Sequence, residues 1–221
     1  MPRVIAFNGS PRKQWNTATL LDSALQGAAE AGADTELVHL YDVDFKGCVS
    51  CFACKTRANA RTGRCFYRDG LTPALELVKD ADALVFGSPI YLGAETGEMR
   101  SFLERLVFPY ITYTESHESV FPRRIPVGLI YTMNVPEEAV AGGVFPIGQH
   151  LELMENFLGR TFGSAESLYC CDTLQFDDYG KMYAPVFDAA AKARRREEVF
   201  PHDCARARDL GRRLAQGLAT P

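Results

Sequence analysis

The residues best suited to chemistry in this sequence are four cysteines that lie close together. Three have C-x2-C-x2-C spacing and the fourth follows after ten intervening residues: Cys48, Cys51, Cys54 and Cys65. Thiolates so spaced can reach one centre, and cysteine quartets bind iron–sulfur clusters or zinc. The four are therefore candidate iron–sulfur ligands. A working [4Fe–4S] centre, reduced thiols without a cluster, and zinc or a redox disulfide all remain open.

Basic residues surround these thiols in the sequence. They are Lys55, Arg57, Arg61 and Arg64. Positive charge would stabilise thiolates or the net negative charge of a cluster. The same side chains could instead bind the phosphates of a nicotinamide cofactor.

A second polar group follows the first predicted strand, in residues 8–17. A phosphate in this loop would accept hydrogen bonds from Ser10, Asn16, Thr17 and backbone N–H groups. Arg12 and the dipole of the following helix would favour its charge. Since the loop has neither G-x-G-x-x-G nor G-x-x-x-x-G-K-[ST], it predicts a site for the phosphate monoester of a mononucleotide cofactor. Asn16 or Thr17 is also the predicted cap of the following helix. In the alternative interpretation the loop is only a capped helix start, and these side chains only satisfy the backbone.

The loop after the third predicted strand, residues 87–97, has the composition expected around a flat ring. Pro89, Ile90 and Tyr91 stand beside Gly93. Apolar and aromatic side chains can cover a ring face, while glycines let backbone N–H groups reach its polar edge. In the alternative interpretation, Ile90 and Tyr91 only pack against the following helix.

Short apolar segments alternate with helical patterns and would position these loops. Strands are predicted over 4–7, 36–40, 83–87, 126–131 and 167–171, and helices over 16–32, 72–78, 96–106, 147–158 and 188–217, the last broken near Pro201. Each crossover helix must pack its apolar stripe on the sheet, so the pattern predicts an α/β fold with a doubly wound, five-stranded parallel sheet. Ligands of such sheets bind beyond the carboxyl ends of the strands, where both loops lie.

Composition narrows the function classes. The chain has 221 residues, 47% of them hydrophobic, which predicts one domain over 1–221 with a C-terminal helical extension from about residue 185. A net charge of −4 gives no basic excess for nucleic acid or an anionic membrane surface. We find no secretory signal and no apolar run of the roughly 18 residues that span a bilayer, so we expect a cytoplasmic protein. In that compartment, the odd number of seven cysteines favours metal or redox chemistry over disulfides.

The remaining reactive residue types have less suggestive positions. The four histidines are scattered without a ligand spacing, and no G-x-S-x-G elbow indicates a triad hydrolase. Cys170, Cys171 and Cys204 are expected to be core residues. The Arg194-Arg195-Arg196-Glu197-Glu198 run is expected on a solvated helix surface, with a phosphate site as the alternative. Trp15 could cover a cofactor or meet another subunit.

Taken together, these motifs resemble the flavodoxin-like NAD(P)H-dependent FMN reductase family, including its iron–sulfur flavoprotein branch. The resemblance covers about the first 110 residues closely. It rests on Gly9-Ser10-Pro11-Arg12 with Asn16-Thr17, Gly47-Cys48-x-x-Cys51-x-x-Cys54-Lys55, Gly63-Arg64-Cys65, and Ser88-Pro89-Ile90-Tyr91-x-Gly93 with Thr96-Gly97-x-Met99-Arg100. Cys65 departs from the iron–sulfur branch, where the fourth cysteine follows after a shorter gap.

The resemblance implies a strand order of 2-1-3-4-5 and a bound FMN. The FMN phosphate would lie in the loop from Ser10 to Thr17 and the ring against Pro89, Ile90, Tyr91 and Gly93. Tyr131, Thr132 and Met133, at the end of the fourth predicted strand, would form a further wall. No catalytic side chain is implied.

The resemblance also implies an activity. The protein would take hydride from NADPH or NADH and pass electrons to a small acceptor such as a quinone, free flavin or metal ion. One alternative is an electron carrier with FMN and a [4Fe–4S] cluster that serves a protein partner. Another is a binding module that has the fold without the cofactor. A homo-oligomer is expected, because a neighbouring chain commonly completes flavin sites in this family.

Overall fold

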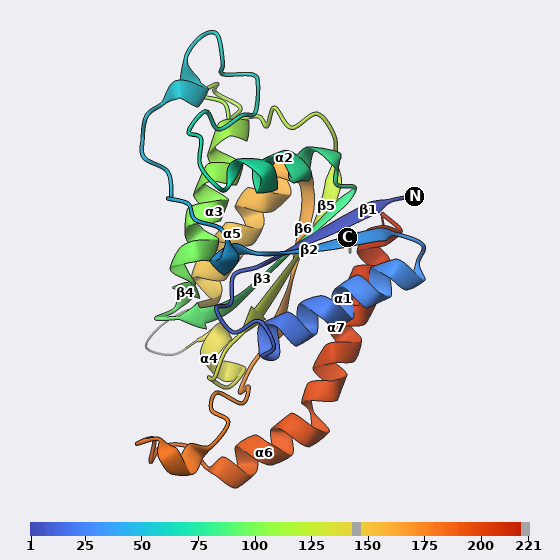
Figure 1. The fold of residues 1–221 in the computed structure, drawn as a ribbon, viewed down its shortest axis with the longest axis vertical. Helices are drawn as coiled ribbons and strands as arrows, with labels where there is room; N and C mark the ends of the chain where they lie inside the picture. Colours follow the sequence, from blue (N-terminus) through green and yellow to red (C-terminus); the bar gives the residue numbers. More distant parts are fainter. Residues whose placement is uncertain (143–146, 218–221) are drawn as a thin grey trace.

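The computed structural model describes residues 1–142 and 147–217 (Figure 1). Within these residues, parallel strands form a central sheet in the order β2-β1-β3-β5-β6. The strands are β1 (Arg3–Asn8), β2 (Asp34–His39), β3 (Ala83–Tyr91), β5 (Ile125–Thr132) and β6 (Gly163–Cys170). Counted along the chain, these parallel strands have the order 2-1-3-4-5. The predicted class of fold is therefore confirmed.

Helices cover both faces of the sheet (Figure 1). One face carries α1 (Asn16–Glu30) and α7 (Phe200–Ala215), and the other carries α2 (Thr72–Asp80), α3 (Gly97–Val107) and α5 (Ile147–Phe162). Alternate residues of β1 supply the two cores: Ile5 and Phe7 on the α3 side, Val4 and Ala6 on the α1 side. This alternation follows from the two-residue period of a strand. Short helices α4 (Glu138–Ala141) and α6 (Ala189–Glu198) complete the α-helices of the described chain.

The segment after the third predicted strand differs from the prediction. We expected a loop over residues 87–97, but β3 continues to Tyr91 and pairs with a short antiparallel strand, β4 (Ala94–Glu95). The turn between them consists of Leu92 and Gly93, both with positive φ, of +53° and +85°. A two-residue hairpin turn needs this backbone, and glycine adopts it without steric penalty. A sequence search for continuous apolar runs does not detect such a short hairpin.

The C-terminal region forms two helices, as predicted, with the break at Val199 and Pro201 in the first turn of α7. The prediction that residues 194–198 form a solvated surface holds for the exposed Arg194, Glu197 and Glu198 but is wrong for the other two. Arg195 forms an ion pair with the buried Asp203 (2.6 Å), and Arg196 donates a hydrogen bond to Asn16 Oδ1 (2.8 Å). These contacts fasten α6 to α7 and α1. Residues 218–221 of the predicted extension lie outside the described residues.

None of the helices in the described chain combines the length and apolar character needed to cross a membrane.

Candidate functional site

The two sequence-predicted loops meet around one cavity of about 350 Å³ at the carboxyl ends of β1, β3 and β5. Ligand sites in proteins commonly have volumes of roughly 300–1,000 Å³. The predicted cofactor residues that line it are Ser10, Arg12, Asn16, Thr17, Pro89, Ile90, Tyr91 and Thr132. Gly93 lies outside this lining set, because it forms the β3–β4 turn instead. The role of Gly93 beside the ring stays a prediction.

The first turn of α1 faces this cavity and is buried. Asn16 and Thr17 are only 5% and 2% exposed. The N-cap is Trp15, whose side chain makes no capping hydrogen bond, and no acidic residue lies in the described first turn. The N–H groups of a helix start carry partial positive charge and need acceptors. A buried start without a side-chain cap is suited to an anion such as a phosphate.

The sequence predicted Asn16 or Thr17 as the cap of α1, and this was wrong. Both side chains instead contact other parts of the chain. The Thr17 and Thr132 hydroxyls are 2.8 Å apart, and the Asn16 amide donates to the Leu174 carbonyl oxygen at 2.8 Å. Helix α1 begins at Asn16, directly after its N-cap residue Trp15.

The loop between β1 and α1 is held rigidly from two sides. Asn8 accepts a hydrogen bond from the Ser10 N–H (2.9 Å), and the Ser10 hydroxyl accepts one from the Arg12 N–H (3.1 Å). The Thr96 hydroxyl, which caps α3, donates to the Gly9 carbonyl (2.7 Å). A Cβ at Gly9 would lie 2.7 Å from that of Met99, so only glycine fits there. Rigid placement of donors is what a phosphate site requires.

The β3–β4 hairpin contains a buried carboxylate, that of Glu95 opposite Ile90, which sequence reasoning missed. Glu95 of β4 accepts a hydrogen bond from the Tyr131 hydroxyl (3.2 Å), and its other oxygen lies 3.0 Å from His150 Nε2. Burial, and then the nearby Glu95 carboxylate, raise the pKa of Tyr131 well above its usual range. The three side chains join the β3–β4 hairpin to β5 and α5. A lone glutamate between two glycines gives no spacing that would reveal this role.

The rest of the cavity is formed by residues beyond the end of β5 and β6, which the sequence also did not indicate. They are Met133, Asn134, Thr173, Leu174, Gln175, Phe176, Asp177 and Met182, together with Trp15 of the first loop. No periodic pattern marks residues 171–188. Whether these residues line the cavity depends on the path of the chain after β6, which the sequence pattern does not reveal.

The four predicted metal ligands line a second, much smaller cavity of about 20 Å³. Cys48 and Cys51 are exposed, Cys65 is half-buried and Cys54 is buried. Burial raises the pKa of the Cys54 thiol above its usual value. Within residues 1–142 and 147–217, no three Cys, His, Asp or Glu side chains are arranged to hold a metal ion. The cysteines are thus gathered at one place, but their arrangement does not fit a metal centre.

Arg105 of α3, which sequence reasoning missed, adds positive charge beside these thiols. Its side chain is buried and donates to the carbonyls of Lys46 (3.0 Å) and Tyr67 (2.7 Å) and to the Asp69 carboxylate. It lines the same small cavity as the four cysteines. The predicted Lys55 donates to the Phe108 and Ile111 carbonyls, and its charge lowers the pKa of the Cys54 thiol, opposing the larger effect of burial. Arg61 and Arg64 pair with Glu118 and Glu76, each at 3.4 Å.

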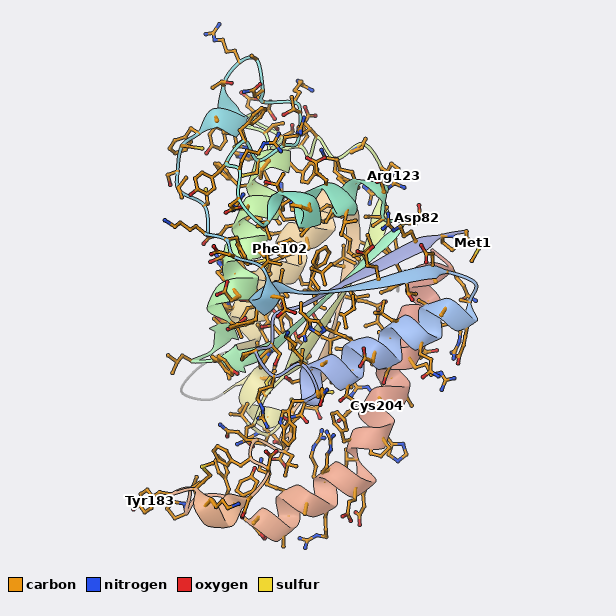
Figure 2. The ribbon with its side chains drawn as sticks, viewed as in Figure 1. Met1, Asp82, Phe102, Arg123, Tyr183 and Cys204 are labelled. Atoms are coloured by element: carbon orange, nitrogen blue, oxygen red, sulfur yellow. The ribbon has the colours of Figure 1, made fainter. Side chains whose placement is uncertain are left out.

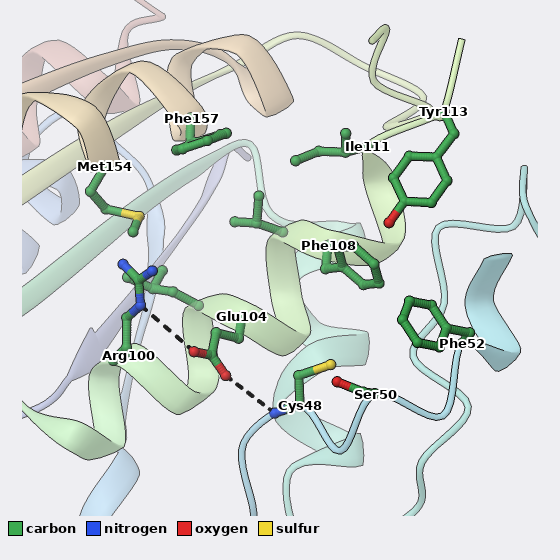
Figure 3. A pocket seen from close by; sticks show the side chains of 12 residues that line it. Cys48, Ser50, Phe52, Arg100, Glu104, Phe108, Ile111, Tyr113, Met154 and Phe157 are labelled. Atoms are coloured by element: carbon green, nitrogen blue, oxygen red, sulfur yellow. Dashed lines mark hydrogen bonds and ion pairs between the residues drawn. The ribbon is translucent and has the colours of Figure 1, made fainter.

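A third cavity, of about 450 Å³, lies between α3, α5 and the cysteine segment (Figure 3). Its lining is mostly apolar and includes four aromatic side chains: Phe52, Phe108, Tyr113 and Phe157. At its polar side, Glu104 lies 3.7 Å from Arg100 and accepts a hydrogen bond from the Cys48 N–H (3.4 Å). Unlike the first cavity, this third cavity has no buried helix start among the described residues that line it.

The fold is flavodoxin-like, and comparison with known proteins gives the family. The family model for NADPH-dependent FMN reductase matches residues 2–133, more than half of the chain. The chain belongs to this family.

Curated relatives carry the name iron-sulfur flavoprotein. One from Methanocaldococcus jannaschii is 34% identical over 103 residues, 47% of this chain and 51% of that protein. Another, from Archaeoglobus fulgidus, is 28% identical over 166 residues, 66% of this chain and 79% of that protein. The match to the first relative thus spans only about half of its length.

Solved structures share the fold at low sequence identity. An NAD(P)H:quinone oxidoreductase from Methanothermobacter marburgensis superposes with a TM-score of 0.72 at 17% identity, over 96% of this chain and 98% of that one. An FMN-dependent NADH-azoreductase from Bacillus anthracis, solved with FMN, gives a TM-score of 0.64 at 15% identity, over 97% and 100%.

Proposed function

We propose that this protein is an FMN-dependent oxidoreductase that takes hydride from NADH or NADPH and passes electrons to a small acceptor. The observation that carries the proposal is the buried, uncapped start of α1, which shares one cavity with the Pro89–Tyr91 segment. An anion site and an apolar wall in the same cavity match the two ends of FMN. Membership of the FMN reductase family supports the same cofactor.

The chain's own residues would bind and orient the cofactor. The Ser10 and Thr17 hydroxyls and the N–H groups of the first turn of α1 would hold the phosphate, and Pro89, Ile90 and Tyr91 would contact the ring. FMN, when bound, supplies the hydride and electron chemistry. The Glu95 contacts to Tyr131 and His150 hold the β3–β4 hairpin in place, so that the ring-contacting residues keep their positions.

The acceptor can be tested directly. We expect steady-state oxidation of NADH or NADPH by FMN-loaded protein to accelerate on addition of a quinone, free flavin or a ferric chelate. Each acceptor is assayed against the flavin-free protein as a blank. Failure of all three to accelerate turnover, with FMN bound, would contradict a small-molecule acceptor and favour a protein partner.

A second candidate function is an electron carrier in which a cysteine-bound [4Fe–4S] cluster works with FMN. It is favoured by the four cysteines around one cavity and by the name of the curated relatives. The arrangement of the thiols does not fit a metal, so we derive no electron path through a cluster.

The cluster is tested by metal analysis. If it is present, anaerobically purified protein should contain iron and acid-labile sulfide, and Cys51→Ser should remove both while FMN is retained. Cys204→Ser, at a half-buried cysteine on α7, is the matched control and should change neither. Wild-type protein free of iron and sulfide would contradict this second function.

We also propose that the protein is a homo-oligomer. Support comes from apolar side chains of the third cavity that are exposed: Phe52, Tyr113 and Phe157 are 42–68% exposed. Contiguous exposed apolar surface is unusual on a monomer. In sedimentation, the wild type should be larger than one chain, and Phe157→Glu should shift it toward the monomer. A monomeric wild type would contradict the proposal.

A further inference from the structure

The segment that follows β6 crosses the cofactor cavity, and we name residues 173–182 the strap. The members that line the cavity are Thr173, Leu174, Gln175, Phe176, Asp177 and Met182. Figure 1 shows the chain leaving β6 at the end of the sheet where α1 begins, and Figure 2 shows Tyr183, the next residue, at the outer tip. The family match ends at residue 133, so the strap lies beyond it.

Three side chains beside the start of α1 hold the main chain of the strap. Arg12 donates to the Gln175 carbonyl (2.6 Å), and both Trp15 Nε1 (3.1 Å) and the Asn16 amide (2.8 Å) donate to the Leu174 carbonyl. The Arg12 guanidinium also stacks 3.8 Å from the Trp15 ring centroid. Hydrogen bonds to carbonyls fix the path of the strap's main chain directly over the first turn of α1.

Helix α6 anchors the strap at its other side. Lys192 is 5% exposed and donates to Asp172, just before the strap, and to Asn134 in the cavity wall. Arg196 donates to Asn16 Oδ1, which places the Asn16 amide between α6 and the strap. A buried ammonium is unfavourable unless it is paired, so these bonds are expected to persist.

We propose that the strap makes the site selective for a flavin mononucleotide over a dinucleotide and slows flavin release. This inference rests on the proposed phosphate site. A phosphate at the first turn of α1 would lie beside Arg12, Trp15 and Asn16, the residues that hold the strap. The second phosphate and adenosine of FAD would have to pass through the segment that these residues fasten. The strap also closes the exit for the smaller flavins, with or without a phosphate.

Two variants loosen the strap in different ways. Arg12→Lys with Trp15→Phe keeps a positive charge and an aromatic ring but removes the guanidinium and the indole N–H that bind the strap. Lys192→Met removes the anchor at Asp172 and Asn134. Affinities for FMN, FAD and riboflavin are measured by titration of flavin-free protein, and release rates by dilution of loaded protein. Lys181→Ala is the control, since that exposed strap side chain pairs only with Asp178 among described residues.

Both strap variants should lower the preference for FMN over FAD by at least about tenfold. Both should also release FMN and riboflavin faster, by similar factors of about ten. Changes of this size are expected for the loss of one or two hydrogen bonds. Lys181→Ala should behave as the wild type. An unchanged FMN-to-FAD ratio with unchanged release rates would overturn the strap proposal and leave FMN binding intact. An effect on FMN without one on riboflavin would also overturn it, because Arg12 would then act on the phosphate. A wild type that binds FMN no more tightly than riboflavin would contradict the phosphate site itself.

Discussion

A variant carrying Ser10→Ala and Thr17→Val should bind FMN at least about 100-fold more weakly than the wild type, while riboflavin affinity stays within about threefold. A hydrogen bond to a charged group contributes about 1.5–3 kcal/mol, and about 1.4 kcal/mol corresponds to a tenfold change in affinity. Losing two such bonds therefore accounts for a factor of about 100 or more. Titration of flavin-free protein, followed by quenching of flavin fluorescence, measures both affinities.

The matched control for this variant is Thr19→Ala with Ser23→Ala on the same helix. These hydroxyls donate to the carbonyls of Trp15 (3.0 Å) and Thr19 (2.8 Å) and do not line the described cavity. The control should bind FMN as the wild type does. Equal losses of FMN and riboflavin affinity in the Ser10 and Thr17 variant would refute the phosphate assignment, because riboflavin carries no phosphate.

Gly211→Ala should destabilise the protein by about 2–3 kcal/mol, in the range observed for overpacked cores. Helices α1 and α7 contact each other through paired glycines. A Cβ at Gly211 would lie 1.8 Å from the Ala24 carbonyl oxygen, and one at Gly27 would lie 1.8 Å from that of Arg208. Main-chain atoms cannot move aside individually, so the helices must separate. This separation outweighs the gain of about 1 kcal/mol in helix propensity on replacing glycine by alanine.

Urea denaturation measures this loss as a lower midpoint with an unchanged slope. Gly97→Ala at the start of α3 is the control, because a Cβ there meets no described atom within 4 Å. It should leave the midpoint unchanged or raise it. A Gly211→Ala midpoint equal to that of the wild type would show that α1 and α7 do not pack this closely.

The sequence was sufficient to predict the sheet and the loops at its carboxyl edge, because apolar strand and helix periods are local signals. Ser10, Thr17, Pro89 and Thr132 come from distant parts of the chain, yet the topology brings them to one cavity. Parallel strands end at the same edge, so the fold class alone implies this convergence.

The parts that could not be predicted depend on tertiary contacts. Arg12 and Asn16 were assigned to the phosphate, but their side chains bind carbonyls of the strap, more than 150 residues later in the chain. Arg105 looks like an ordinary basic residue on the surface of α3, yet it is buried by the cysteine segment that folds around it. No periodicity encodes either contact. The C-x2-C-x2-C spacing predicted proximity of the thiols, but spacing does not determine the arrangement that a metal needs.

The central claim is that the cavity over α1 and β3 binds FMN for hydride transfer from a nicotinamide. The most direct measurement is flavin extraction from purified protein after loading with FMN, combined with anaerobic absorption spectra before and after addition of NADH or NADPH. We predict one FMN per chain and bleaching of the visible flavin absorption by at least one of the two donors. A chain that retains no FMN after loading, or whose bound FMN stays oxidised with both donors, would contradict the proposed function.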